Sequence, residues 1–147
     1  MWQLITLCLA HPAFVFPTIA ATRTCLAIAN QHYGKAHHLD GQANAFRHAL
    51  WNFLIAKRLD HKNKERVLAW TKNITDWHER AFPNTKMARF MDTHNNKVGR
   101  KLFVMYTGKS KEEITQQLLH MAQNAKAIHA HDKQSLPDQT LVYLKQS

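Results

Sequence analysis

Residues 41–59 are apolar around almost the whole circumference when the segment is drawn as a helix. A helix that is apolar on every side has to be surrounded by other elements, because no side of it can face water. Its apolar members are Ala45, Phe46, Ala49, Leu50, Trp51, Phe53, Leu54, Ile55 and Ala56. The segment therefore predicts a central buried helix, around which the rest of the chain folds.

Helical periodicity recurs along nearly all of the remaining chain, and no segment shows the alternation expected of a strand. Four Gly and four Pro among 147 residues are too few for an all-β protein with many tight turns. Further helices are expected at about residues 2–10, 14–33, 64–82, 85–106 and 111–129. The sequence thus predicts one all-α domain, residues 1–147, built as a bundle of about five to six helices.

Several residues mark the ends of these helices. Gly34 is expected to stop the second helix, and Ser110 with Glu113 forms a capping box that opens the last one. Residues 35–40 are polar and predict an exposed connection. The apolar run 141–144 is expected to dock on the body of the domain. The histidines in polar stretches, which are expected to face solvent, are His37, His38, His129 and His131.

The first 22 residues carry no charged side chain. A signal peptide would have a basic region before its apolar core, and this segment has none. A membrane span needs about 20 continuous apolar residues, whereas Pro12 and Pro17 interrupt this one. We therefore expect residues 2–10 to pack on the body of a cytoplasmic protein, with a membrane an unexpected partner. The alternative is a protein exported or membrane-associated through this segment.

The chain is strongly basic, with 20 Lys and Arg against 10 acidic residues and a formal net charge of +10. Such a charge favours anionic partners, such as nucleic acid or phosphate-bearing molecules, although scattered lysines also serve only as a soluble surface. Cys8 and Cys25 both lie in apolar surroundings and do not form a disulfide framework. Composition alone therefore leaves enzymes and binding modules equally open.

Three polar clusters interrupt helices that otherwise have a core pattern. They are Asn44, Arg47, His48 and Asn52; Asp76, His78 and Glu79; and Asp92, Asn95, Asn96 and Arg100. Burial of polar groups costs free energy unless each group finds a partner. The clusters therefore predict either an internal hydrogen-bond network or a functional site. Gly99 lies beside the third cluster and would allow another helix to approach closely.

These residues suit acid–base chemistry. A histidine titrates near neutral pH and can act as a general base, while a carboxyl group can orient it or act as the acid. The candidate catalytic residues are His48, His78, Glu79 and Asp92. Arginines and amides can hold a phosphate or a developing oxyanion. The candidate substrate-binding residues are Asn44, Arg47, Asn52, Asn95, Asn96 and Arg100.

Other chemistries are less well supported. The histidines and carboxylates of the three clusters meet the ligand requirements of a divalent metal, but their spacing matches no established motif such as HExxH, HxH or ExxH. No cofactor is firmly implied, and a divalent metal stays an open alternative. No Ser or Cys lies in a nucleophile elbow, and no glycine-rich phosphate loop is present.

The motifs NAFRHALWN, WTKNITDWHE and MDTHNNKVGR, in this order, resemble an uncharacterised family of small helical bacterial proteins. The resemblance covers about residues 11–103. Related domains are similar to modules at the ends of larger secreted, toxin-like proteins. The resemblance implies an all-α fold and a signature comprising Arg47, His48, His78, Glu79, Asp92, Asn95, Asn96, Gly99 and Arg100. It implies no established activity.

Two functions remain as hypotheses. The first is a hydrolase-like or toxin-related domain that acts by acid–base chemistry on an anionic, phosphate-containing substrate. The second is a non-catalytic basic module that binds nucleic acid, a protein partner or an anionic membrane surface, with the polar clusters serving as scaffold. A solvent-reachable cavity over His48, His78 and Asp92 would favour the first. A sealed, fully paired cluster with a continuous basic face elsewhere would favour the second.

Overall fold

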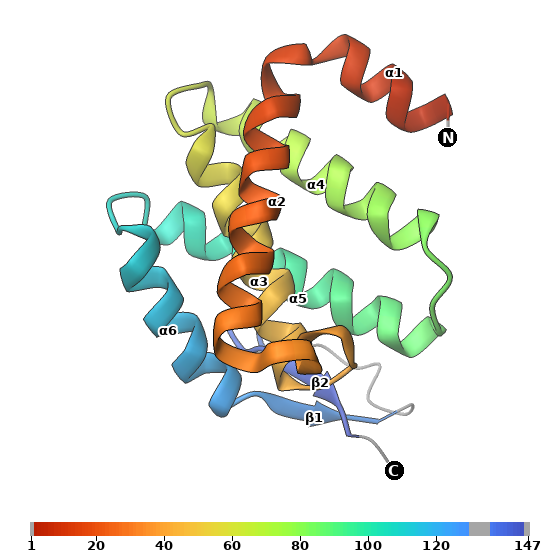
Figure 1. Ribbon diagram of the computed structural model, residues 1–147, viewed down its shortest axis with the longest axis vertical. Coiled ribbons are helices and arrows are strands. Elements are labelled where there is room, and N and C mark those ends of the chain that lie inside the picture. Colours follow the sequence, from red (N-terminus) through yellow and green to blue (C-terminus); the bar gives the residue numbers. More distant parts are fainter. Residues whose placement is uncertain (1, 130–135, 146–147) are drawn as a thin grey trace.

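The computed structural model describes residues 2–129 and 136–145 of the chain, and within them it is a mostly helical domain (Figure 1). The helices are α1 (Trp2–Ala10), α2 (Pro12–Tyr33), α3 (Gln42–Arg58), α4 (Lys64–Ala81), α5 (Lys86–Met105) and α6 (Lys111–Gln123), with the 3-10 helix η1 (Gly34–His38) before α3. The predicted all-α bundle is confirmed. The expected ends are also found: Gly34 follows α2 with φ of 54°, and both bonds of the Ser110–Glu113 capping box open α6.

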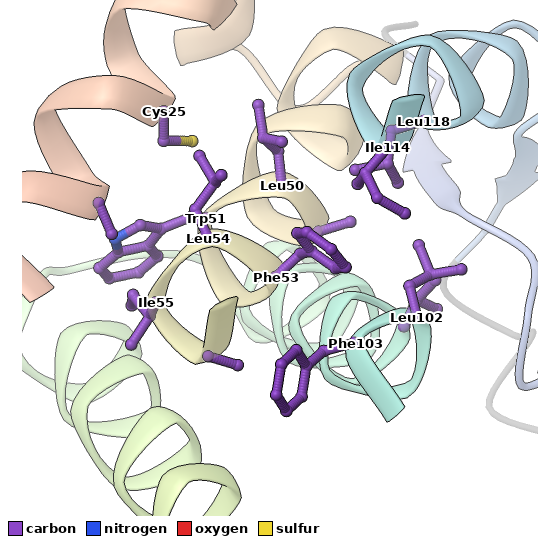
Figure 2. Close-up of a cluster of buried hydrophobic side chains, with 14 of the residues drawn as sticks. Cys25, Leu50, Trp51, Phe53, Leu54, Ile55, Leu102, Phe103, Ile114 and Leu118 are labelled. Carbon is purple, nitrogen blue, oxygen red and sulfur yellow. The ribbon is translucent and has the colours of Figure 1, made fainter. Parts of the chain in front are cut away.

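Helix α3 is the centre of the domain, as its apolar circumference predicts. It contacts α2, α4, α5 and α6, and every residue from Ala43 to Ala56 except Arg47 is buried. Figure 2 shows its side chains radiating in several directions, with Trp51 directed toward α2 and Phe53 toward α5. Any polar side chain between Ala43 and Ala56 is therefore placed in the interior, unless it reaches past its neighbours as Arg47 does.

Helices α3 and α5 pack closest at Gly99. A Cβ atom built on Gly99 would lie 2.1 Å from the carbonyl oxygen of Ala49, far inside van der Waals contact. Glycine is therefore required by the approach of the two backbones and not by an unusual backbone angle. Because His48 precedes Ala49 and Asn96 lies one turn before Gly99, this close approach brings the first and third polar clusters together.

The C-terminal part differs from the prediction. Helix α6 ends at Gln123, and strand β1 (Lys126–Ile128) pairs in parallel with β2 (Val142–Leu144). Strands of three residues offer no periodicity long enough to recognise, so the sequence predicted a helix as far as residue 129. The expected docking of residues 141–144 is confirmed, since Leu141 and Val142 are fully buried and β2 contacts both α3 and α5.

The connection after α2 also differs from the prediction. Residues 34–38 form η1, and His37 is fully buried instead of facing solvent, with its Nε2 3.0 Å from Asn30 Oδ1. Its carbonyl oxygen accepts a hydrogen bond from Arg47 Nε at 3.1 Å. The expected exposure of His38 and His129 is confirmed, and His131 lies outside the described residues. Burial of His37 therefore serves to fix η1 against the start of α3.

Helix α1 packs on the body less fully than expected. Leu7 packs on the core, whereas Ile5 and Leu9 are exposed. A nine-residue helix that is apolar on all sides can turn only one side toward its neighbours. One segment, Pro12–His38, is long and apolar enough by composition to cross a membrane, although its helix α2 packs against α3 here.

Candidate functional site

His48 of α3 lies at the meeting point of the three polar clusters. Its side chain is 2% exposed, and both ring nitrogens have polar neighbours. Nδ1 lies 3.1 Å from Asn96 Oδ1 and 3.4 Å from Glu79 Oε1. Nε2 lies 2.7 Å from Arg47 Nη2 and 3.3 Å from Asp92 Oδ1. Helices α3, α4 and α5 thus place an imidazole, two carboxyl groups and a guanidinium in direct contact.

The neighbours of His48 define its protonation. A guanidinium can only donate, so Nε2 accepts from Arg47 and the proton of the neutral ring resides on Nδ1, where Asn96 Oδ1 accepts it. Burial, followed by the charge of Arg47, holds the pKa of His48 well below its usual range. The imidazole is therefore neutral near pH 7, with its basic nitrogen directed at Arg47 and Asp92.

Glu79 and Asp92 form a buried carboxyl pair. Burial raises the pKa of both groups, and the repulsion of Glu79 adds to the effect on Asp92, whose pKa rises to about 8. Each carboxyl group also contacts the His48 ring, Glu79 at Nδ1 and Asp92 at Nε2. Two buried carboxyl groups in contact do not both ionise readily, because like charges repel strongly at low dielectric. The site thus contains a proton donor beside a basic nitrogen near neutral pH.

A chain of amides supports these groups from behind. Arg100 Nη1 donates to Asn52 Oδ1 at 2.8 Å, and Asn52 Nδ2 donates to Asn96 Oδ1 at 2.7 Å. Asn96 Nδ2 in turn donates to Glu79 Oε1 at 3.1 Å. Thr75 of α4 completes this chain by donating to Asn52 Oδ1 at 3.3 Å. Asn52 and Asn96, both expected in the site, therefore orient its reactive groups from positions that are 0% exposed.

A pocket reaches the site only as far as Arg47. The Arg47 pocket, as we call it, has a volume of about 150 Å³ and is lined by Thr22, Cys25, Leu26, Arg47, Trp51 and His78. Neither His48 nor Asp92 lines it. The half-buried Arg47 side chain therefore lies between the pocket and the His48 ring. The sequence left two arrangements open, an open cavity over His48 and Asp92 or a sealed cluster with every polar group paired. The structure shows neither, because Arg47 covers the cluster and yet Asp92 Oδ1 has no hydrogen-bond partner among the described residues.

His78 is close to the site but takes no direct part in its contacts. Its ring packs on Trp51 at 5.1 Å and on Phe82 at 4.6 Å between centroids, and it faces the Arg47 pocket. Burial and the charge of Arg47 lower the pKa of His78. The imidazole is positioned to meet a molecule in the pocket, whereas His48 is positioned behind Arg47.

The remaining sequence candidates lie elsewhere. Asn95 is fully occupied by β2, since its Nδ2 donates to Val142 O at 2.8 Å and its Oδ1 accepts from Val142 N at 3.0 Å. Asn44 is buried near the start of α3, with Oδ1 unpaired. Asp76 forms an ion pair with Lys72. None of these three makes a recorded contact with His48.

Two residues of the site were missed from the sequence. Thr75 donates into the amide chain, and Asn84 Nδ2 lies 3.4 Å from Asp92 Oδ2. A threonine inside a helix usually bonds its own backbone, as Thr75 also does to Thr71 O, so it carries no distinctive signal. Asn84 lies in the connection between α4 and α5, where asparagine is a common turn residue and does not by itself indicate a site. Its contact depends on how the chain turns back into α5.

His48, Glu79 and Asp92 are also the candidate metal ligands among the described residues. One ligand atom from each lies within 4.8 Å of the others, and all three are buried. A histidine nitrogen with two carboxylate oxygens suits zinc or a harder divalent ion. The unpaired Asp92 Oδ1 is an acceptor available to such an ion.

The chain was compared with protein families, curated proteins and solved structures, and only the comparison with families finds a match. No curated protein and no solved structure matches the chain significantly. A family of domains of unknown function, DUF6973, matches residues 5–126, which include the greater part of α1, the whole of α2 to α6 and the residues of the site. The chain therefore belongs to the DUF6973 family.

Proposed function

We propose that the protein is a small hydrolase that acts on an anionic, phosphate-containing substrate, with His48 as general base and Asp92 as general acid. The observation that supports this most directly is the 3.3 Å contact between His48 Nε2 and Asp92 Oδ1 inside the domain. Titratable groups with pKa values displaced by burial and by each other are common at catalytic sites. A purely structural core could use apolar side chains at these positions at a lower cost in free energy.

In the proposed reaction a water molecule attacks the phosphorus atom, and His48 Nε2 removes one proton from that water. The bond between phosphorus and the leaving oxygen breaks, and Asp92 gives its proton to that oxygen. The substrate's phosphate would draw the Arg47 guanidinium off Nε2, because an anion binds a guanidinium more strongly than a neutral imidazole does. Glu79 and the amide chain hold His48 in the required tautomer.

A divalent cation is the second candidate for the electrophile at this site. His48, Glu79 and Asp92 would hold it, and the proton of Asp92 would be released on binding. A bound cation would polarise the phosphoryl oxygen and activate water. Calorimetric titration of metal-free protein with Zn²⁺, Mn²⁺ or Mg²⁺ tests this candidate. Heat that is lost in Asp92→Asn supports it, and an absence of heat with all three ions excludes it.

The alternative of a basic binding module receives less support. Lys97 and Lys101 form ion pairs with Asp138, and Lys72 pairs with Asp76. Positive charge around α5 is thus partly neutralised within the protein. A nucleic-acid surface would instead keep such lysines free for phosphates.

The test is hydrolysis of p-nitrophenyl phosphate, bis(p-nitrophenyl) phosphate and a p-nitrophenyl phosphonate ester by the full chain, with and without divalent ions. Turnover by the wild type should be lost in His48→Ala and in Asp92→Asn. His120→Ala, on the exposed face of α6, should retain it. Turnover that survives in His48→Ala, or that is absent from every substrate, would refute the proposal.

A further inference from the structure

We infer that the substrate is an amphiphile with a single acyl chain and a phosphate head group, its chain lying between α2 and α4 and its phosphate at Arg47. The inference rests on the proposed function for the reaction. The binding of the amphiphile is inferred separately, from a second pocket, and can be measured without any hydrolysis.

The second pocket adjoins the first. This tryptophan pocket has a volume of about 270 Å³. It is lined by Cys8, Val15, Thr18, Ile19, Thr22, Trp51, Trp70, Ile74, Trp77 and His78. The two pockets share Thr22, Trp51 and His78 in their walls. Mostly apolar pockets with a few placed polar groups are typical of small-molecule sites.

The polar atoms in the wall of the tryptophan pocket are already paired with each other. Trp51 Nε1 donates to Thr22 Oγ1 at 2.8 Å, and Trp70 Nε1 donates to Thr18 Oγ1 at 2.9 Å. Each threonine hydroxyl donates in turn to a carbonyl oxygen one turn earlier in α2. These indoles and hydroxyls therefore have no free donor for a polar ligand, and the surface that they present suits a hydrocarbon chain.

The shape of the combined site is elongated. Its lining residues on α2 run from Val15 to Leu26, and the rise of an α-helix between these two positions is about 16 Å. Ile19 and Leu26 on this line are 44% and 37% exposed, so the rim is apolar as well. A flexible chain lying along α2 would cover these side chains and remove apolar surface from water.

The head-group end is defined by Arg47. Its recorded partners are the His37 carbonyl oxygen, through Nε, and the His48 ring, through Nη2, and neither is an anion. A guanidinium has five N–H donors, so three have no hydrogen-bond partner among the described residues, and Arg47 lines the pocket. A phosphate there would meet a half-buried positive charge beside His78. The apolar wall and the single cation together favour a molecule that is apolar at one end and anionic at the other.

Three of the four tryptophans line the tryptophan pocket, so binding can be followed by fluorescence quenching. The probe is a lysophosphatidate with a dibrominated acyl chain, used below its micelle concentration with the full chain. The same chain on a neutral monoacylglycerol and chainless glycerol 3-phosphate serve as comparisons. We expect saturable quenching by lysophosphatidate, at least tenfold weaker binding of the monoacylglycerol, and no measurable competition by glycerol 3-phosphate.

Two substitutions separate the ends of the site. Arg47→Gln should weaken lysophosphatidate at least tenfold and leave the monoacylglycerol unchanged. Val15→Phe, which narrows the tryptophan pocket, should weaken both, whereas Val104→Phe, on exposed α5 surface, should weaken neither. No saturable quenching, or quenching that Val15→Phe leaves unchanged, would overturn the inference.

The lysophosphatidate titration is repeated with His48→Ala, so that binding is measured separately from the hydrolysis that the proposed function requires. Saturable binding without hydrolysis by the wild type would retain the amphiphile site and reject the hydrolase. Hydrolysis of p-nitrophenyl substrates without lysophosphatidate binding would reject the amphiphile and retain the hydrolase.

Discussion

Substitution of Gly99 by alanine tests the contact that brings the polar clusters together. The new methyl carbon would lie 2.1 Å from the Ala49 carbonyl oxygen and 2.9 Å from the Ala49 Cα. Ordinary contact between such atoms requires about 3.5 Å, so α3 and α5 would have to separate by roughly 1.4 Å. Both neighbours are backbone atoms, which cannot rotate away as a flexible side chain can.

The expected magnitude follows from two opposing effects. Forcing an extra methyl group into a packed interior costs about 1–3 kcal/mol, and a rigid backbone neighbour places this case at the upper end. Alanine is favoured over glycine inside a helix by about 1 kcal/mol, which offsets part of that cost. We therefore expect a net loss of about 2 kcal/mol. For a domain of this size, that loss corresponds to a fall in melting temperature of about 4–8 °C.

The assay is thermal unfolding followed by far-ultraviolet circular dichroism, together with urea titration. Gly108→Ala is the matched control, because a Cβ there would meet no atom within 4 Å. Its free energy of unfolding should change by no more than about 0.5 kcal/mol. A Gly99→Ala protein as stable as the wild type would show that α3 and α5 do not approach as closely as described.

Three further predictions concern individual side chains. Because the pKa of folded Asp92 is raised to about 8, unfolding releases its proton and wild-type stability falls as pH rises from about 4 to about 8. Asp92→Asn has no proton to release at this position. The difference between its melting temperature and that of the wild type, measured with EDTA present, should therefore increase from about pH 4 to about pH 8. A difference that does not change with pH would contradict the raised pKa of Asp92. Asn95→Ala should cost about 1–3 kcal/mol in urea unfolding by leaving the Val142 backbone unpaired, and a loss below 0.5 kcal/mol would mean that β2 docks without it. Burial raises the pKa of the Cys25 thiol to about 12, so a thiol reagent should leave Cys25 unmodified in the native protein at pH 8 and label it after unfolding; native labelling mapped to Cys25 would contradict its burial.

The central helix and the meeting of the polar clusters could be predicted because both depend on helical periodicity. His48 lies among the apolar residues of α3, and Glu79 and Asp92 lie beside the apolar stripes of α4 and α5, so helices packed around α3 bring these three together. Their contact requires only that α3, α4 and α5 be neighbours. Gly99 indicated in advance where two of these helices approach closest.

The parts that could not be predicted depend on contacts between residues distant in the sequence. Asn95 has the same character in the sequence as Asn96, yet one pairs with the backbone of β2 and the other with His48. Adjacent residues of a helix point about 100° apart, and only the position of the C-terminal strand decides which of them faces the site. His37 was misjudged for the same reason, because its burial follows from the packing of η1 on α3.

The direction of the amide chain fixes which atoms of the buried site donate hydrogen bonds and which accept them. Arg100 can only donate, so the oxygen of Asn52 has to accept and its nitrogen has to donate to Asn96. Asn96 is thereby turned so that its oxygen accepts from His48 Nδ1 and its nitrogen donates to Glu79. Glu79 is thus held as an acceptor, while burial and the Glu79 carboxylate raise the pKa of Asp92, whose Oδ1 lies 3.3 Å from His48 Nε2. Arg100, at the half-buried end of the amide chain, therefore determines which group donates and which accepts in each hydrogen bond from Asn52 to His48 and Glu79.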